Sequence, residues 1–108
     1  MKKAFTCISL FCFFIPSFAQ KPDSIPYGNN PKAGKYYDVR GFKMYAETYG
    51  NGKPLLFIHG NSGSIEHWTL QIPYFAQKYK VIIPDSHAHG HSADSTTDSL
   101  SYEMLASD

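Results

Sequence analysis

Residues 54–63 read PLLFIHGNSG, and residues 81–92 read VIIPDSHAHGHS. In each stretch a continuous apolar run leads directly into a loop that is rich in glycine and histidine. Continuous apolar runs are typical of strands that are buried on both faces of a parallel sheet. We therefore predict two such strands, at residues 54–58 and 80–83.

The residues between these two strands carry a helical pattern. Large apolar side chains recur there at spacings of three or four: Ile65, Trp68, Ile72, Phe75 and Tyr79. Pro73 would remove a hydrogen bond from the middle of a single helix, so we predict two short helical pieces, the second beginning at Pro73. Strand, helices and strand form a βαβ unit, whose crossover is expected to be right-handed.

The residues before position 54 are expected to form an antiparallel hairpin. Residues 36–40 and 42–49 are rich in aromatic and β-branched side chains, and Gly41 lies between them as a tight turn. In the second run Phe42, Met44, Ala46 and Thr48 alternate with Lys43, Tyr45, Glu47 and Tyr49. This is the period of a strand with one face in water, and we expect the second set to lie on that face. Residues 101–108 are expected to begin a further helix.

The first nineteen residues differ from the rest of the chain. Two lysines precede an apolar run that ends at Phe14, and residues 17–19 (SFA) supply small residues where a signal peptidase reads. Residues 1–19 are therefore predicted to be a secretory signal peptide, cut between Ala19 and Gln20, which predicts a secreted or periplasmic protein. The apolar run is short for a membrane anchor. Cleavage as a lipoprotein at Cys12 is an alternative that the preceding bulky residues disfavour.

The composition of the exported chain excludes several function classes. The whole chain has a net charge of +1, and without Lys2 and Lys3 eight basic side chains face nine acidic ones, a net charge of −1. This balance argues against nucleic-acid partners and against membrane binding after signal cleavage. Both cysteines leave with the signal peptide, which excludes disulfides and thiolate ligands from residues 20–108. Three prolines within residues 20–34 predict a flexible linker to a domain over residues 35–108.

The two loops together resemble the N-terminal part of the alpha/beta-hydrolase family. That family has a His-Gly-x-x-Gly loop after its third strand, as at 59–63, and Pro-Asp-x-Arg-Gly-His-Gly-x-Ser after its fourth, as at 84–92. Order, spacing and flanking strands agree from Tyr36 to Asp108. His87 stands where arginine is usual, and Ala88 stands where glycine is usual. The expected fold class is therefore α/β, the N-terminal part of a hydrolase sheet built from an antiparallel hairpin and a βαβ unit.

The resemblance also implies roles for the residues of both loops. The backbone N–H of Asn61 would be the oxyanion donor, which stabilises charge that develops only in the transition state. The neighbouring residues His59, Gly60, Ser62 and Gly63 would line the substrate pocket. In the second loop Asp85, His89 and Gly90 would have a structural role.

The family's nucleophile, acid and histidine, in that order, would all follow residue 108. We therefore expect a fragment, truncated before the nucleophile elbow and inactive by itself. In the family the third strand lies between the fourth and the fifth, so residues 55–58 would form an unpaired apolar edge, an aggregation hazard. The complete protein is expected to be an exported hydrolase that cleaves esters, lactones or similar bonds in a small-molecule substrate without a cofactor. An Asp nucleophile would instead indicate an epoxide hydrolase or a dehalogenase.

Other uses of these residues are weighed against those roles. Ser62 could be a nucleophile, but its loop supplies the oxyanion donor, and we expect its hydroxyl to cap the following helix. Ser92 lies too far beyond its strand to be a nucleophile elbow. The alternative function is a non-catalytic module that binds a divalent metal through His87, His89 and His91. Because these side chains alternate along a loop, no metal site is predicted.

Overall fold

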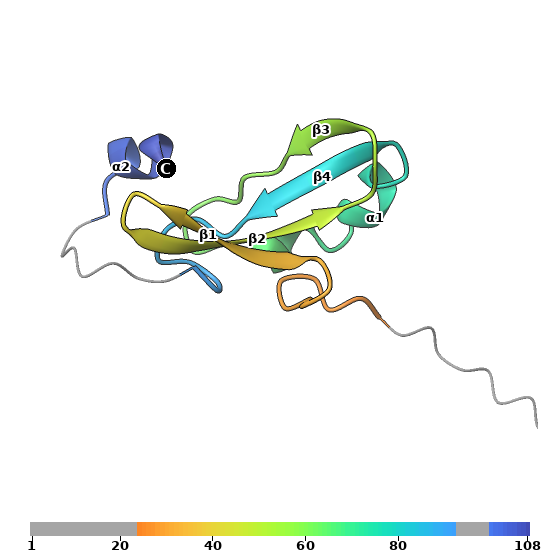
Figure 1. Ribbon diagram of the computed structural model, residues 1–108, viewed down its shortest axis with the longest axis horizontal. Helices are drawn as coiled ribbons and strands as arrows, with labels where there is room; N and C mark the ends of the chain where they lie inside the picture. Colours follow the sequence, from red (N-terminus) through yellow and green to blue (C-terminus); the bar gives the residue numbers. More distant parts are fainter. Residues whose placement is uncertain (1–23, 93–99) are drawn as a thin grey trace, which may run out of the picture.

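The chain folds around one mixed sheet of four strands in the order β1-β2-β4-β3 (Figure 1). The computed structural model describes residues 24–92 and 100–108, so the expected signal peptide lies outside the described residues. The strands β1 (Gly34–Val39) and β2 (Phe42–Tyr49) form an antiparallel hairpin. The strand β4 (Tyr79–Pro84) lies antiparallel to β2 and parallel to β3 (Lys53–Leu56). The predicted fold class is confirmed.

The hairpin between β1 and β2 closes through a two-residue turn. Val39 pairs with Phe42, and the residues between them, Arg40 and Gly41, have φ angles of 43° and 90°. Two consecutive positive φ angles are typical of a type I′ turn, whose twist matches that of the flanking strands. Gly41 adopts this conformation without the cost that a side chain would add.

Two short helical pieces connect β3 to β4, as the sequence predicts. They are the 3₁₀ helix η1 (Ile65–Trp68) and the helix α1 (Ile72–Phe75). Pro73 lies in the first turn of α1, where a backbone N–H has no intrahelical acceptor to lose. The expected cap by Ser62 is wrong, because Ser64 occupies the N-cap position of η1. A last helix, α2 (Tyr102–Ser107), follows. Within the described ranges, no helix is long and apolar enough to cross a membrane.

The hydrophobic core lies between one face of the sheet and the two crossover helices. Val81 and Ile83 of β4 pack with Tyr45 of β2 against Ile65 of η1 and Ile72 of α1. The four aliphatic side chains are fully buried. Burial of each contributes about 1.5–3 kcal/mol relative to exposure. This small cluster fixes how η1, and therefore the loop before it, sits on the sheet.

Both faces of β2 are buried in part: Phe42 and Ala46 on the face that the sequence predicts, and Tyr45 and Glu47 on the other. Glu47, expected in water, is fully buried beside Tyr45. Its carboxylate accepts hydrogen bonds from the N–H groups of Gly28 (2.9 Å) and Asn30 (2.7 Å) and from the hydroxyls of Tyr45 (2.9 Å) and Tyr49 (2.7 Å). Four donors replace the water that the carboxylate loses on burial. An alternating pattern shows which residues share a face, but not which face is buried.

The Glu47 network also docks the segment that precedes β1. Tyr27 packs edge-on against Tyr49, with ring centroids 5.0 Å apart, and Thr48 donates its N–H to the Ala33 carbonyl. The described part of the expected linker, residues 24–34, is therefore attached to the sheet rather than free. Burial, and then the hydrogen bond to Glu47, raise the pKa of both Tyr45 and Tyr49 above the usual tyrosine value. Both hydroxyls thus keep the protons that they donate.

The strand β3 lies at the edge of the sheet. It pairs only with β4 among the described residues, and Leu56 and Ile58 are 56% and 64% exposed. Phe57 points to the other face, where it contacts Trp68 and Phe75. The prediction that residues 54–58 are buried on both faces is therefore wrong, because within the described chain the face that carries Leu56 and Ile58 is left largely uncovered. The expected unpaired apolar edge is present.

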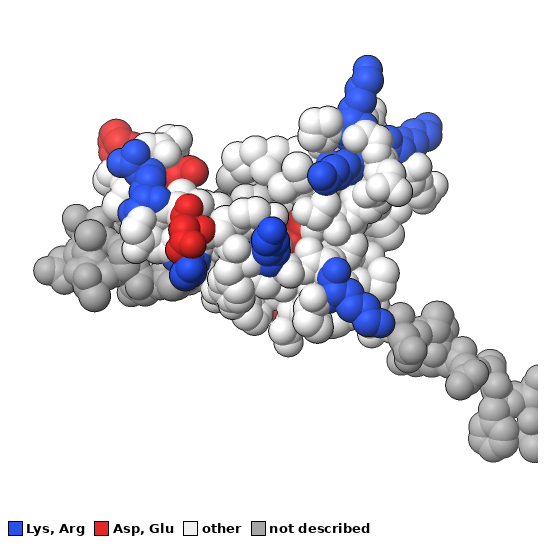
Figure 2. Space-filling model, viewed as in Figure 1, with Lys and Arg blue, Asp and Glu red and all other residues white. Residues whose placement is uncertain are grey.

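Exposed charge is distributed unevenly along the sheet (Figure 2). Lys53, Lys78 and Lys80 are exposed where β3 and β4 begin, and none of them forms an ion pair within residues 24–92 and 100–108. At the other end both signs occur: Arg40, Lys43 and Asp38 are exposed at the hairpin turn, and Glu103 is exposed on α2. The carboxyl ends of β3 and β4, where the family loops lie, are therefore far from the three lysines.

We expect the substitution Glu47→Gln to lower the free energy of unfolding by about 1–3 kcal/mol, because an amide NH₂ group would face hydrogen-bond donors. Urea denaturation of residues 20–108, followed by circular dichroism, measures this change. Glu66→Gln is the matched control, because the Glu66 side chain is exposed. Equal stability of the two variants would show that the buried carboxylate is not an anchor.

The exposed edge should make residues 20–108 self-associate as their concentration rises, because an unpaired apolar strand is a template for further pairing. Leu56→Lys combined with Ile58→Lys should shift the sedimentation profile toward monomer. Leu70→Lys is the control, since Leu70 is 84% exposed but lies outside the strands. Identical profiles for the parent and the edge variant would rule out this edge as the contact.

Candidate functional site

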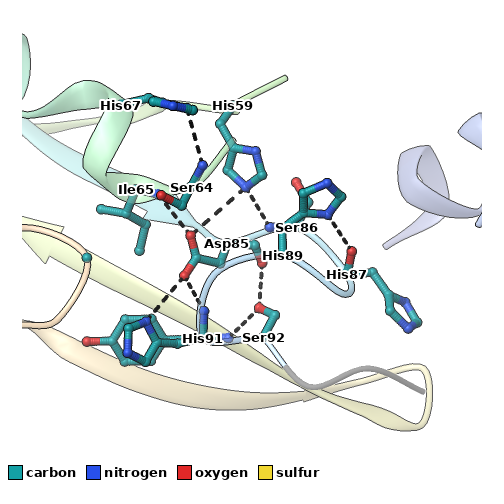
Figure 3. A network of polar contacts seen from close by, with 12 residues as sticks. His59, Ser64, Ile65, His67, Asp85, Ser86, His87, His89, His91 and Ser92 are labelled. Atoms are coloured by element: carbon teal, nitrogen blue, oxygen red, sulfur yellow. Dashed lines mark hydrogen bonds and ion pairs between the residues drawn. The ribbon is translucent and has the colours of Figure 1, made fainter. Parts of the chain in front are cut away.

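The two loops predicted to form the site meet at the carboxyl ends of β3 and β4 (Figure 3). Parallel strands deliver the loops that follow them to the same edge of a sheet. The carboxylate of Asp85, at the end of β4, is fully buried. Its Oδ1 accepts the N–H of Ile65 at 2.8 Å, and its Oδ2 accepts the N–H of His91 at 2.8 Å. One side chain thus holds the start of η1 and the loop 85–92 together.

Gly90 and Ser92 complete the packing around Asp85. Gly90 has a φ of 51°, and a Cβ at this position would overlap the Asp85 carboxylate. The buried Ser92 hydroxyl donates to the Asp85 carbonyl at 2.6 Å and accepts the N–H of Tyr45 at 2.9 Å. Both hydrogen-bonding functions of this hydroxyl are engaged with the backbone. Ser92 therefore has a structural role, consistent with its rejection as a nucleophile.

His59 connects the two loops from beneath. Its Nδ1 lies 2.8 Å from the Gly60 carbonyl, and its Nε2 accepts the N–H of Ser86 at 2.9 Å. A carbonyl only accepts and an N–H only donates, so the imidazole is neutral with its proton on Nδ1. The 4.0 Å approach of Nε2 to Asp85 is then not an ion pair. The His59 side chain is 1% exposed and supports the loop, whereas the sequence predicts that it lines the substrate pocket.

Residues 60–63 form a tight turn. The Gly63 N–H donates to the Gly60 carbonyl at 2.9 Å, and Ser62 has a φ of 64°. A positive φ at the third position is the signature of a type II turn. A Cβ on Gly63 would lie 2.8 Å from the Gly60 oxygen, so the turn has no room for a side chain there. None of the described residues accepts a hydrogen bond from the Asn61 N–H, which leaves this donor available at the surface.

A cavity of about 290 Å³ opens beside this turn. Asn61 and His89 line one side, and the other side comes from the start of α2 and the residues just before it: Leu100, Ser101, Tyr102, Glu103 and Leu105. Gly60, Ser62 and Gly63, which the sequence assigned to the pocket, are not among the lining residues. The sequence predicts a helix here but does not indicate that the helix lies opposite Asn61 and His89. Hydrogen bonds from its own backbone N–H and from Ser101 lower the pKa of the Glu103 carboxyl.

The histidines of the second loop point in different directions (Figure 3). The His87 ring stacks on Phe42, with centroids 3.8 Å apart. His89 faces Asn61, whereas His91 packs near Tyr45 with centroids 5.2 Å apart. Residues 24–92 and 100–108 contain no group of three histidine, cysteine or acidic side chains that could hold a metal. The three imidazoles therefore do not form the metal site considered as an alternative.

His87, which replaces the family's usual arginine, has a role of its own. Its Nδ1 lies 3.1 Å from the Asp108 carboxylate, and both side chains are nearly buried, 5% and 4% exposed. Asp108 also approaches the Arg40 guanidinium, with 3.5 Å between Oδ1 and Nε. This contact joins the loop after β4 to the end of α2 and to the hairpin turn. It positions the helix that forms the second wall of the cavity.

Residues 53–108, just over half of the chain, match the alpha/beta hydrolase fold family. The chain belongs to this family. A soluble epoxide hydrolase from Corynebacterium sp. (strain C12) is 37% identical over 54 residues, which are 50% of this chain and 19% of that protein.

Solved structures of the family superpose on most of the described sheet. An epoxide hydrolase from Vigna radiata aligns with a TM-score of 0.64 and 26% identity, covering 69% of this chain and 25% of that one. An N-acyl homoserine lactone degrading enzyme aligns with a TM-score of 0.56 and 35% identity, covering 58% and 24%. The chain thus spans about a fifth to a quarter of the proteins that it matches.

The loop after β4 predicts opposite effects for two small substitutions. Ala88→Gly should stabilise the chain by about 1 kcal/mol, because Ala88 has a φ of 58°, which glycine adopts at lower cost. Gly90→Ala should destabilise it by about 2–4 kcal/mol, through strain and overlap with Asp85. Thermal unfolding of the variants measures both effects.

Gly60→Ala is the control for this pair, because a Cβ on Gly60 meets no atom within 4 Å and its φ is not positive. It should change the stability less than Gly90→Ala does. A stabilising Gly90→Ala substitution would contradict the observed placement of Asp85.

Proposed function

We propose that the complete protein is an exported hydrolase that cleaves an ester, lactone or similar bond in a small molecule by nucleophilic catalysis. In this proposal the Asn61 N–H is the oxyanion donor, and the nucleophile, acid and histidine lie beyond residue 108. Membership of the family and the two-loop site support it. Export rests on the predicted signal peptide, and N-terminal sequencing of secreted protein should find Gln20 first.

The single observation that carries the proposal is the free Asn61 N–H beside a cavity. Within the described chain this donor has no acceptor, although the N–H groups of Ser62 and Gly63, which follow it in the turn, are both engaged. A backbone donor held by a tight turn is already oriented before the substrate binds. Such a donor stabilises the oxyanion of a tetrahedral intermediate more strongly than it stabilises the ground-state carbonyl, which is how it accelerates the reaction.

A second candidate within the same fold is an epoxide hydrolase with an Asp nucleophile. The relative from Corynebacterium and the structure from Vigna radiata, both epoxide hydrolases, favour it. That chemistry passes through an ester between enzyme and substrate, whose hydrolysis also generates an oxyanion. The donor role of Asn61 is the same in both candidates, and the substrate class separates them.

Asn61→Pro tests the donor in the protein that the complete reading frame encodes. Proline has no N–H but suits the second position of a type II turn, so the turn should persist. Hydrolysis of nitrophenyl esters, or of a styrene-type epoxide if esters are inert, should fall by about 10²–10³ in kcat. Asn61→Ala keeps the N–H and is the matched control. Equal activity of the two variants would remove the oxyanion role.

Residues 20–108 alone should show no turnover of either substrate above buffer, because no positioned nucleophile is present to generate the oxyanion. The assay follows gel filtration, so that a soluble species is measured. Turnover that a Ser62→Ala variant abolished would instead make Ser62 a nucleophile and would refute the proposal that the nucleophile lies beyond residue 108.

A further inference from the structure

The His89 imidazole has three polar neighbours: the His87 carbonyl, the Ser62 N–H and the Asn61 side-chain oxygen. Its Nδ1 lies 2.8 Å from the His87 carbonyl, which can only accept, so Nδ1 carries a proton. The Ser62 N–H, which can only donate, points at Nε2 from 3.1 Å. An imidazole protonated on Nδ1 alone accepts the Ser62 N–H at Nε2, whereas a proton on Nε2 would be donated to Asn61 Oδ1 instead.

The Ser62 N–H belongs to the one peptide plane that distinguishes the observed turn from its commonest alternative. A type II turn differs from a type I turn by rotation of its central peptide, here the one between Asn61 and Ser62. The type II form requires a positive φ at Ser62, where glycine or asparagine is usual. For a serine this conformation is strained. An external acceptor for the Ser62 N–H offsets that cost.

Two acceptors share this N–H. The Asn61 Oδ1 lies 3.1 Å from the Ser62 nitrogen and 3.2 Å from His89 Nε2, so the three groups form one cluster at the mouth of the cavity. The Asn61 side chain belongs to the turn itself and moves with it. His89 belongs to the loop after β4, where its Nδ1 is held by the His87 carbonyl, so its contact with Ser62 connects the turn to that second loop.

We propose that His89 is a positioning residue for the oxyanion turn: its neutral imidazole holds the 61–62 peptide in the orientation that keeps Ser62 at positive φ. The inference rests on the proposed function of Asn61 and adds the residue that acts through it. With Ser62 engaged by His89, the adjacent Asn61 N–H is the donor left for the cavity. In this role the Nε2 lone pair accepts the Ser62 N–H, so His89 does not act as a general base or as a metal ligand.

Nuclear magnetic resonance on the protein that the complete reading frame encodes tests the contact itself. The expected result is a through-hydrogen-bond coupling between the Ser62 amide nitrogen and His89 Nε2, with the ring proton on Nδ1. His91→Phe, which alters a neighbouring imidazole of the same loop, should leave the coupling in place. An absent coupling or a proton on Nε2 would overturn the proposal, and both outcomes are independent of catalysis.

Three variants of the complete protein then test the positioning role. His89→Phe removes the acceptor and should lower kcat about 10–100-fold, with KM changed much less. His89→Gln retains an acceptor in its amide oxygen and should recover part of the loss. Adding Ser62→Gly to His89→Phe should restore most of the activity, because glycine adopts the positive φ unaided.

The pattern of rescue separates positioning from a direct chemical role. If Ser62→Gly fails to rescue His89→Phe, or if His89→Gln is as impaired as His89→Phe, then His89 acts otherwise and the proposal fails. A complete protein with no hydrolase activity would refute the proposed function, whereas the Ser62–His89 coupling would still decide whether His89 holds the turn.

Discussion

The buried carboxylate of Asp85 is the interaction on which the rest of the site depends. It accepts N–H groups from Ile65, at the start of η1, and from His91, in the loop after β4. Without such donors, burial of a carboxylate would cost several kcal/mol. Both loops are therefore held in the positions that place their N–H groups within hydrogen-bond distance of Asp85. The neutral His59, which accepts the Ser86 N–H, and Ser92, which accepts the Tyr45 N–H, add further cross-connections. Two loops that are separate in sequence thereby act as one rigid unit.

Glu47 is a second buried carboxylate that is compensated by hydrogen-bond donors. It lies fully buried on the sheet face that carries Tyr45, and the N–H groups that it accepts come from the segment before β1. The aliphatic core between these two carboxylates is small, with four fully buried side chains. Polar anchors with several donors each therefore specify where the segments lie, whereas the apolar cluster supplies most of the favourable burial.

The histidines of the two loops make several different kinds of contact. His59 and His89 both place a proton on Nδ1 against a carbonyl and leave Nε2 to accept an N–H. His87 instead stacks on an aromatic ring and meets a carboxylate of the α2 region. A cluster of imidazoles that suggests metal binding in the sequence is, in the fold, a set of connections between loops. The spacing of ligands along a chain does not determine whether their lone pairs converge.

The sequence by itself determined the order of the elements and the identity of the two loops. Apolar runs, helical spacing and the Gly-rich motifs are local signals, and the hairpin, the two-piece crossover and the hydrolase sheet followed from them. Only the tertiary structure decided that Glu47 faces the core and that residues 24–34 pack on the sheet. It also placed the start of α2 opposite Asn61. Each of these depends on partners distant in sequence, and alternation along a strand carries no information about which of its two faces those partners cover.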